Sequence, residues 1–372
     1  MIKLASIIFL QLILVVITVG CKKKEKVDAG YVVARFKELA DSIRKVAYHA
    51  QRIDTFSRGQ TVWNNSGMAL IEKDSSDELF GFSFYAKRDD VAKAFIYDKG
   101  MQFEVNDSSK TYQMSRASHG FLGSPGGQMI YHNLFFLDSI YKSRVLEETE
   151  SRFILTYQFD DDTVYNVSDI VKVVELSKNS FFPVRTTITS KVAGFKSFSQ
   201  TILTDVSINK QVQNSIKGYK DELQNYSLLA PSVRKSNQLI GQKFPQISLP
   251  DLLDQDTRDL MIERLTLIDF WETWCGPCIA SLPKVQELKD RYPTQLSVIG
   301  IISEDREVAL RFIENKGITY ENFLGSPELL KSLNVNSWPT YFLIDEQGIV
   351  RKEYVGFSQQ IEEDIKKLSK DI

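Results

Sequence analysis

The stretch Trp274-Cys275-Gly276-Pro277-Cys278 decides how the last third of this chain folds. It follows an apolar run at residues 265–271 and opens a helical pattern over residues 279–291. Two thiols on the first turn of a helix are close enough to form a disulfide, and the free amides and dipole of the helix favour the thiolate of the first. We therefore predict a redox pair with Cys275 as the nucleophile and Cys278 as the resolving thiol.

A zinc site is the main alternative for a C-x-x-C pair. A structural zinc ion needs four ligands, and the chain contains only three cysteines and three histidines. The histidines at positions 49, 119 and 132 lie far upstream, and there is no second C-x-x-C pair. We expect no metal, and no cofactor other than the redox-active disulfide itself.

Three segments resemble the TlpA-type, membrane-anchored thioredoxin-fold thiol-disulfide oxidoreductases: residues 240–245, 268–278 and 337–345. The resemblance implies an α/β thioredoxin fold for residues 239–372. It also implies a cis peptide bond between Trp338 and Pro339, opposite the two sulfurs. Taken without this resemblance, a proline at position 339 indicates only a strand edge or a turn. By the resemblance, the substrate-binding residues are Trp274, Gly276, Pro277, Trp338 and Pro339.

Asp269 lies within the apolar run, six residues before Cys275. Burial of a carboxylate is costly and raises its pKa, which makes Asp269 a candidate proton acceptor. Thioredoxin has a buried aspartate at this place, and the resemblance implies that Asp269 takes the proton of Cys278. The other interpretation is a surface-facing carboxylate at a sheet edge. Gly300 stands where thioredoxin has a lysine, and Glu272 and Thr273 are expected to be exposed.

The first residues indicate where the protein works. Lys3 is followed by an apolar segment at 4–20 and then by Cys21, which is typical of an export signal with a lipoprotein cleavage site. We expect a signal segment at 1–20, a charged tether at 21–30 and lipidation of Cys21. An uncleaved membrane anchor is the alternative, and the lysines at 22–24 would favour the opposite orientation. The expected location is extracytoplasmic and membrane-anchored.

Residues 31–207 are expected to form a separate α+β domain with an antiparallel sheet, so that an antiparallel-sheet domain precedes the thioredoxin-fold domain. A helix is predicted at 32–51 and a helical insert at 126–141, and residues 208–238 are expected to be a linker. The expected strands include residues 79–85, 94–97, 101–105, 153–159 and 197–203. The order of elements resembles the half-barrel of LolA-type lipoprotein carriers, carried by residues 173–176, 182–185 and 204–206.

The formal net charge of −2 gives no basic excess, which argues against a nucleic-acid partner. We predict a membrane-tethered oxidoreductase that reduces disulfides in client proteins and draws electrons from a membrane thiol donor. The alternative is a lipid- or lipoprotein-binding module whose thioredoxin-like domain serves for docking or redox sensing. A thiol peroxidase is disfavoured because Thr273 is neither preceded by proline nor correctly spaced from Cys275.

Overall fold

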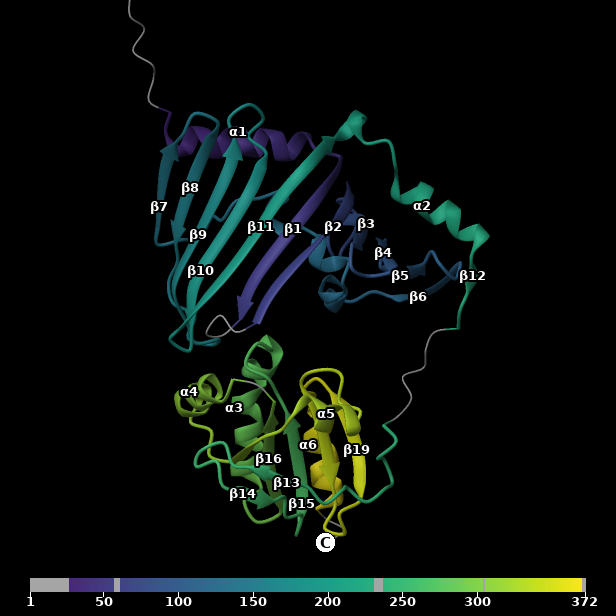
Figure 1. The fold of residues 1–372 in the computed structure, drawn as a ribbon, viewed down its shortest axis with the longest axis vertical. Helices are drawn as coiled ribbons and strands as arrows, with labels where there is room; N and C mark the ends of the chain where they lie inside the picture. Colours follow the sequence, from purple (N-terminus) through teal and green to yellow (C-terminus); the bar gives the residue numbers. More distant parts are fainter. Residues whose placement is uncertain (1–26, 57–60, 231–236, 304, 370–372) are drawn as a thin grey trace, which may run out of the picture.

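The computed structural model describes residues 27–56, 61–230, 237–303 and 305–369. They form an N-terminal part, up to residue 230, and a C-terminal part, from residue 237, each with its own sheet and core (Figure 1). The expected signal segment, Cys21 and most of the expected tether lie outside the described residues.

Among the described residues, the N-terminal part contains one twelve-stranded sheet in the order β12-β6-β5-β4-β3-β2-β1-β11-β10-β9-β8-β7. Neighbouring strands are antiparallel, except that β12 runs parallel to β6. The strands are β1 (Lys45–Phe56), β2 (Thr61–Lys73), β3 (Phe82–Arg88), β4 (Lys93–Asp98), β5 (Met101–Asn106), β6 (Thr111–Arg116), β7 (Ser143–Glu148), β8 (Arg152–Gln158), β9 (Val167–Ser177), β10 (Pro183–Val192), β11 (Phe195–Ile208) and β12 (Ser227–Leu228). The helices are α1 (Ala29–Ser42) and α2 (Ile216–Glu222), with short 3-10 turns at η1 (His119–Gly123), η2 (Gly127–Met129), η3 (His132–Leu134), η4 (Asn209–Gln211) and η5 (Leu223–Asn225).

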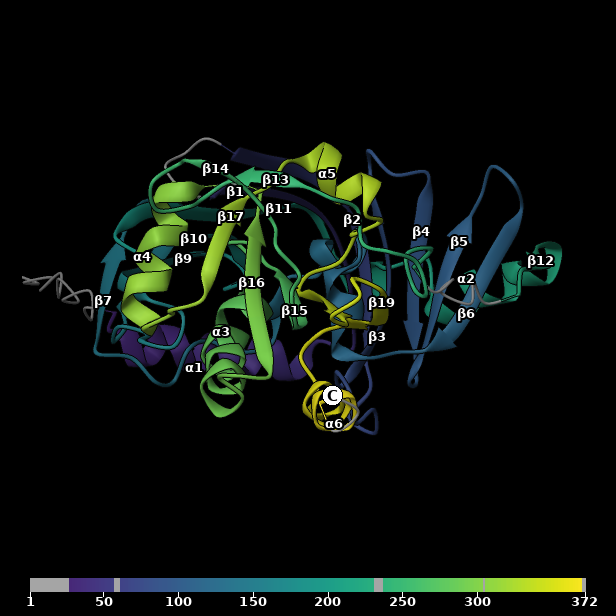
Figure 2. The same cartoon turned by 90° about the horizontal axis from the view of Figure 1, so that it is seen from below.

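Other elements cover parts of both faces of this sheet. Successive side chains of a strand point to opposite faces, so Ala69 and Ile71 join one core and Leu70 joins another. On the first face, α1 packs on β8 and β9, and residues 121–134 pack on β1 to β4. Figure 2 shows the sheet curved around α1. On the other face, α2 packs on β2, β4 and β5.

The first helix is shorter than expected. It begins at Ala29, where the Asp28 side chain accepts a hydrogen bond from the Tyr31 amide at 2.7 Å. It ends at Ser42, so the helix predicted at 32–51 is wrong beyond that residue. The chain continues as β1, in which Val46, Tyr48 and Ala50 alternate and are buried. Pairing with β2 and β11 on either side determines the strand, and the pairing with β11 is not local in sequence.

Two further predictions in this part are wrong. The strand expected at 79–85 begins only at Phe82, because the Asp77 carboxylate accepts hydrogen bonds from the amides of Phe80 and Gly81 and holds a turn. The helix expected at 126–141 consists of short 3-10 turns. This segment buries three consecutive residues, Met129 to Tyr131, against the sheet, which one face of a helix does not allow.

The expected linker at 208–238 is largely ordered. Residues 216–228 form α2, a 3-10 turn and the edge strand β12. Ile216 and Leu223 are buried in the same apolar cluster as Leu70 and Ile96 of the sheet. These apolar residues attach the segment to the N-terminal part, because burying them removes apolar area from water.

The C-terminal part has a five-stranded sheet in the order β17-β16-β15-β18-β19, counted over the residues that the structure describes. The strands β15, β16 and β17 are parallel, and β18 and β19 form an antiparallel hairpin beside β15. The elements are β13 (Ser248–Pro250), β14 (Thr257–Asp259), β15 (Leu265–Phe270), α3 (Gly276–Arg291), β16 (Leu296–Ile302), α4 (Arg306–Lys316), β17 (Glu321–Leu324), α5 (Pro327–Ser332), β18 (Thr340–Ile344), β19 (Val350–Val355) and α6 (Gln359–Leu368).

The central strand β15 is buried along its whole length. Leu267 and Trp271 pack against α3 on one face, while Ile268 and Phe270 face the other core. Helices on both faces of a mostly parallel sheet explain why this strand is a continuous apolar run. Among the residues described, no helix has the length and apolar character needed to span a membrane.

Candidate active site

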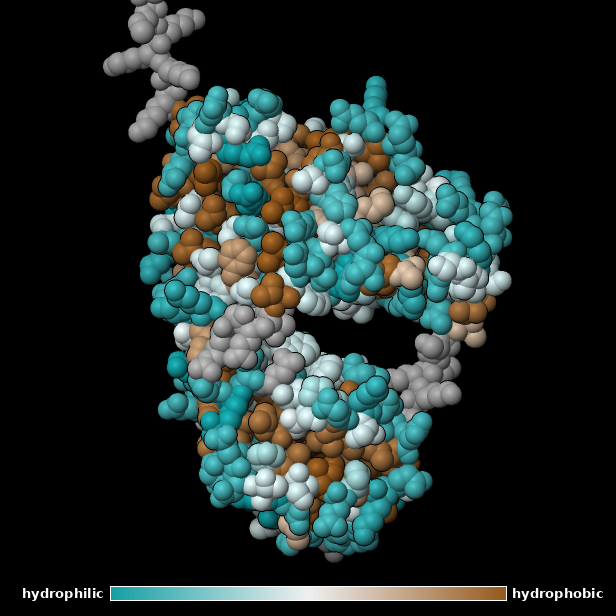
Figure 3. Space-filling model, viewed as in Figure 1, coloured by the Kyte–Doolittle hydropathy of each residue, from teal (hydrophilic) through white to brown (hydrophobic). Residues whose placement is uncertain are grey.

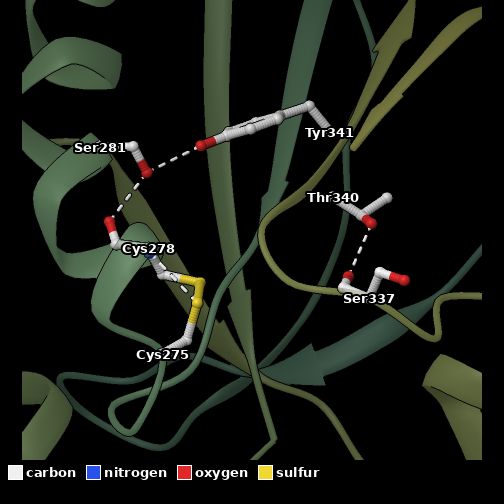
Figure 4. Close-up of a disulfide and its surroundings, with 6 residues drawn as sticks. All are labelled: Cys275, Cys278, Ser281, Ser337, Thr340 and Tyr341. Carbon is white, nitrogen blue, oxygen red and sulfur yellow. Dashed lines mark hydrogen bonds between the residues drawn. A yellow bond between two sulfur atoms is a disulfide. The ribbon is translucent and has the colours of Figure 1, made fainter. Parts of the chain in front are cut away.

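The two cysteines lie where β15 ends and α3 begins. Cys275 and Cys278 form a disulfide with an S–S distance of 2.08 Å (Figure 4). Cys275 is the N-cap of α3, and its Sγ accepts a hydrogen bond from the Cys278 amide at 3.2 Å. Pro277 lies in the first helical turn, where its missing N–H has no cost. The predicted redox pair is therefore brought together as a bonded pair.

The two sulfurs differ in access to solvent. Cys275 is 5% exposed, whereas Cys278 is completely buried. The free amides and the positive end of the α3 dipole stabilise a thiolate at Cys275 after reduction. The outer cysteine is thus the one that an external disulfide can reach, which agrees with the predicted roles of nucleophile and resolving thiol.

Asp269 is buried in the middle of β15, between Gly300 on β16 and Tyr341 on β18. The alternative of a surface-facing carboxylate is wrong. Because side chains alternate along the strand, Asp269 shares the face of Leu267 and Trp271, which is covered by α3 and contains Cys278. The carboxylate lies beneath the helix that bears the thiols.

Burial raises the pKa of Asp269 from 3.8 to about 7, opposed by a hydrogen bond that the Tyr320 hydroxyl donates to Oδ2 at 3.3 Å. Among the described residues, Oδ1 has no hydrogen-bond partner. Burial also raises the pKa of Tyr320 well above its usual range, so that this phenol remains a donor. Asp269 is thereby able to accept or release a proton near neutral pH.

Gly300 faces Asp269 at the place where thioredoxin has a lysine, and the structure explains why no side chain fits. A Cβ atom at Gly300 would lie 1.9 Å from Oδ1 of Asn322. That oxygen accepts a hydrogen bond from Nε1 of Trp271 at 3.0 Å. A buried Trp–Asn contact therefore occupies the space that a longer residue would need.

Trp338 and Pro339 precede β18, and the peptide bond between them is cis. The Trp338 ring packs edge to face on Trp274 at a centroid distance of 5.3 Å, and Trp274 is 46% exposed. Beside them is a groove of about 470 Å³ between the end of β15 and α5. Its lining residues are Glu272, Trp274, Ser303, Pro327, Leu330, Lys331, Asn334, Val335, Asn336 and Trp338. The groove leads to the Trp274 side of the disulfide.

A buried hydrogen-bond chain links the second cysteine to β18, and it was not foreseen from the sequence. The Tyr341 hydroxyl donates to Oγ of Ser281 at 2.9 Å, and Ser281 donates to the carbonyl of Cys278 at 2.8 Å (Figure 4). In the loop before β18, Thr340 donates to the carbonyl of Ser337 at 2.7 Å. These contacts hold α3 and the proline loop in position on either side of the disulfide.

Glu272 and Thr273 are buried, so the expectation that they are exposed is wrong. The Glu272 carboxylate accepts hydrogen bonds from both the amide and the hydroxyl of Ser303, just after β16. It therefore joins the ends of two neighbouring strands beside the disulfide. The sequence does not predict this contact, because Glu272 and Ser303 are 31 residues apart.

Within the described residues, no group of three or more histidine, cysteine, aspartate or glutamate side chains could hold a metal ion. The candidate site is thus made of a disulfide, a buried carboxylate and an aromatic rim. This arrangement is suited to thiol–disulfide exchange, in which one thiolate attacks a disulfide and a second thiol resolves the product.

Residues 239–372 match the model of the Redoxin family. Thiol:disulfide interchange protein DsbE of Allochromatium vinosum is 30% identical over 124 residues, which are 32% of this chain and 67% of that protein. Thiol-disulfide oxidoreductase ResA of Bacillus anthracis is 27% identical over 142 residues, 36% of this chain and 82% of that protein.

Among solved structures, StoA from Bacillus subtilis is similar with a TM-score of 0.29 and 22% identity, covering 33% of this chain and 96% of that one. The family model matches the part of the chain that contains the disulfide. Through residues 239–372, this chain belongs to the redoxin family, and it is a thiol-disulfide oxidoreductase of thioredoxin-like fold.

Proposed function

We propose that this protein is tethered to the membrane at its N-terminus and reduces disulfides of client proteins on the extracytoplasmic side. The observation that carries the chemical part is the disulfide at the start of α3, in which Cys275 is 5% exposed and Cys278 is fully buried on the face of the sheet that also holds Asp269. The names of the relatives, interchange protein and oxidoreductase, support the same chemistry.

The reaction starts from the reduced pair. The Cys275 thiolate attacks one sulfur of the client disulfide, a mixed disulfide forms, and the other client sulfur leaves as a thiolate. Asp269 accepts the proton of the Cys278 thiol, and the Cys278 thiolate then attacks Sγ of Cys275. The second client sulfur leaves, and the bond between Cys275 and Cys278 is restored. Two electrons have passed to the client, and an external thiol donor must return them.

The aromatic rim supports the binding of a client. Trp274 is half exposed and Trp338 packs on it, so both can contact the chain around a client cysteine. Gly276 and Pro277 lie between the two cysteines in the chain, in the first turn of α3. We assign client binding to Trp274, Gly276, Pro277, Trp338 and Pro339.

Two observations support the tether. The sequence has an apolar segment at 4–20 followed by Cys21, although these residues lie outside the described part. The helix α1, the first described element, lies at the end of the N-terminal part that is far from the C-terminal part (Figure 1). If the N-terminus is held at a membrane, the N-terminal part therefore lies between the membrane and the C-terminal part, which contains the redox site.

Lipid or lipoprotein binding by the N-terminal part stays a prediction, as does the likeness to LolA-type carriers. Such a ligand would need the concave face of the sheet. The helix α1 and the buried residues Phe121, Met129 and Leu134 pack against that face. We therefore favour a spacing role for this part over a carrier role.

The test is the reduction potential of the Cys275–Cys278 pair, measured against thiol buffers by tryptophan fluorescence in a Trp63→Phe background. This background leaves only the tryptophans at 271, 274 and 338, all close to the disulfide. A potential near that of thioredoxin, about −270 mV, supports reduction of clients. A potential near about −120 mV would make the protein an oxidant and contradict the proposed direction.

A second experiment tests the assignment of the two thiols. In the Cys278→Ser variant, the mixed disulfide between Cys275 and a client cannot be resolved and should accumulate as a complex that dithiothreitol releases. The Cys275→Ser variant is the matched control and should trap nothing. Trapping through Cys278 instead would contradict the assigned roles.

A further inference from the structure

Two turns of the N-terminal part contact the C-terminal part close to the disulfide. The first connects β8 to β9 and includes residues 162–166, which we call the Tyr165 turn. The Asp162 carboxylate accepts hydrogen bonds from the amides of Val164 at 2.9 Å and Tyr165 at 3.1 Å. Asp162 and Val167 also pair through their backbones. The turn therefore has a defined conformation of its own.

The second turn, between β10 and β11, supports the first. The Ala193 amide donates to the carbonyl of Asn166 at 2.8 Å. Ala193 is buried in the core of the C-terminal part, and Phe195 packs against the same core. The two turns thus form one unit that is anchored in the C-terminal part by apolar burial.

Basic residues of α4 fix this contact. Lys316 donates to the backbone carbonyls of Thr163 and Val164. Arg311 donates to the Ala193 carbonyl at 3.2 Å, and its guanidinium lies 4.4 Å from the centroid of the Phe195 ring. Hydrogen bonds from charged donors are stronger than neutral ones, so α4 holds the Tyr165 turn at a defined position.

That position is beside the redox pair. A Cβ atom placed on Gly276, between the two cysteines, would lie 3.7 Å from Cε1 of Tyr165. Tyr165 remains 39% exposed and Val164 53% exposed. Trp274, on the other side of Cys275, is also exposed. Apolar side chains from both parts of the chain therefore surround the one sulfur that a client can reach.

We propose that the Tyr165 turn is a second wall of the client-binding surface and that its occupant is an extended client segment with apolar residues next to its cysteine. This inference rests on the proposed function. A client sulfur must reach Sγ of Cys275, so the client chain on either side of that sulfur passes Trp274 and Tyr165. Exposed apolar residues gathered at such a place mark a contact surface, and tyrosine is enriched among strong contacts.

The shape of the molecule favours a segment over a folded surface. Cys275 is almost buried between the two walls, so a flat client face could not bring a sulfur close to it. Figure 3 shows an open gap between the two parts on the side away from α4. The helix α5, which lines the groove beside Trp274, borders this gap (Figure 1). An extended chain can enter there and follow the groove as far as Trp274, next to Cys275.

The test compares two substrates with the full-length protein. One is a disulfide-linked peptide with leucine and phenylalanine next to its cysteine, and the other is bis(2-hydroxyethyl) disulfide, which has no apolar side chain to pack on Tyr165. In Tyr165→Ala, we expect KM for the peptide to rise about tenfold while kcat and the rate with the small disulfide stay within twofold. Tyr165→Phe, which keeps the ring, should behave as the unchanged protein.

Val164→Ser and Val145→Ser form a matched pair, because Val145 on β7 is equally exposed at 54% but lies outside the Tyr165 turn. Only Val164→Ser should raise KM for the peptide. An unchanged KM in Tyr165→Ala, or an equal loss on both substrates, would overturn the inference. If the unchanged protein reduces neither substrate, the proposed function itself fails, and the inference fails with it.

Discussion

Replacing Asp269 by asparagine should stabilise the folded protein at high pH and slow its reaction. The carboxylate has a pKa near 7 in the folded state because it is buried, against 3.8 for an exposed group. The folded state therefore binds a proton that the unfolded state has already lost in this interval. Stability falls as the pH rises from 3.8 to 7, and above 7 the penalty is constant.

The size of the effect follows from the two pKa values. One pKa unit corresponds to about 1.4 kcal/mol, so the difference in proton binding at Asp269 between the folded and unfolded states lowers the free energy of unfolding by about 1.5 kcal/mol at pH 5 and about 4 kcal/mol at pH 8. Asparagine does not titrate, and any fixed cost of its buried amide is the same at both pH values. The advantage of Asp269→Asn should therefore grow by about 2.5 kcal/mol between pH 5 and pH 8.

The assay is urea unfolding of the oxidised protein at pH 5 and pH 8, in the Trp63→Phe background so that fluorescence reports on the C-terminal part. Asp345→Asn is the matched control. This carboxylate is also buried, but it accepts hydrogen bonds from the amides of Gln347 and Ile349 and pairs with Arg351. Its replacement should destabilise the protein at pH 8.

The reasoning about Asp269 fails if its asparagine variant shows the same gain in stability at both pH values, or none at pH 8.

The substitution also has a separate kinetic consequence. Without an acceptor for the Cys278 proton, resolution of the mixed disulfide should slow about a hundredfold at pH 7, while formation of the mixed disulfide by Cys275 stays unchanged. A loss confined to the first step would contradict the proton-acceptor role.

Two further substitutions test the packing around these sites. Gly300→Ala should lower the free energy of unfolding of the C-terminal part by at least about 2 kcal/mol, because the new Cβ would displace Asn322 from Trp271. An unchanged urea midpoint would refute the close approach of Gly300 to Asn322. Lys172→Met should destabilise the N-terminal part by about 3 kcal/mol. The buried Lys172 ammonium pairs with Asp138 at 2.7 Å and donates to Asn133 at 3.0 Å, so its removal leaves the Asp138 carboxylate without this partner. The second effect is measured from the part of the tryptophan fluorescence signal in urea unfolding that Trp63→Phe removes, and a shift below about 0.5 kcal/mol would contradict it.

The C-terminal site could be predicted because its signals are local. The C-x-x-C pair, the apolar run that becomes β15 and the hairpin of β18 and β19 are each contained in one short stretch of sequence. Glu272 could not be placed in the same way. It is a single acidic residue just before the cysteines, and the Ser303 that donates two hydrogen bonds to its carboxylate comes from the end of the neighbouring strand.

The secondary structure of the N-terminal part was harder to predict from the sequence, and β1 illustrates the physical reason. Ile43, Val46 and Ala50 have the spacing of a helix face, and Val46, Tyr48 and Ala50 have the spacing of a strand. Local periodicity does not choose between them. The choice is made by backbone pairing with β2 and β11, and β11 is separated from β1 by more than a hundred residues.

The helix α4 shows that contacts between residues far apart in sequence also limit the prediction of function. Its apolar face, with Val308 and Phe312, packs in the core of the C-terminal part. Arg311 and Lys316 on the polar face would ordinarily be assigned to solvent. They instead donate to backbone carbonyls of the N-terminal part, and backbone carbonyls leave no side-chain signal in a sequence. Since these contacts hold the Tyr165 turn next to Gly276, client selection in this protein depends on residues outside the stretch that resembles known oxidoreductases.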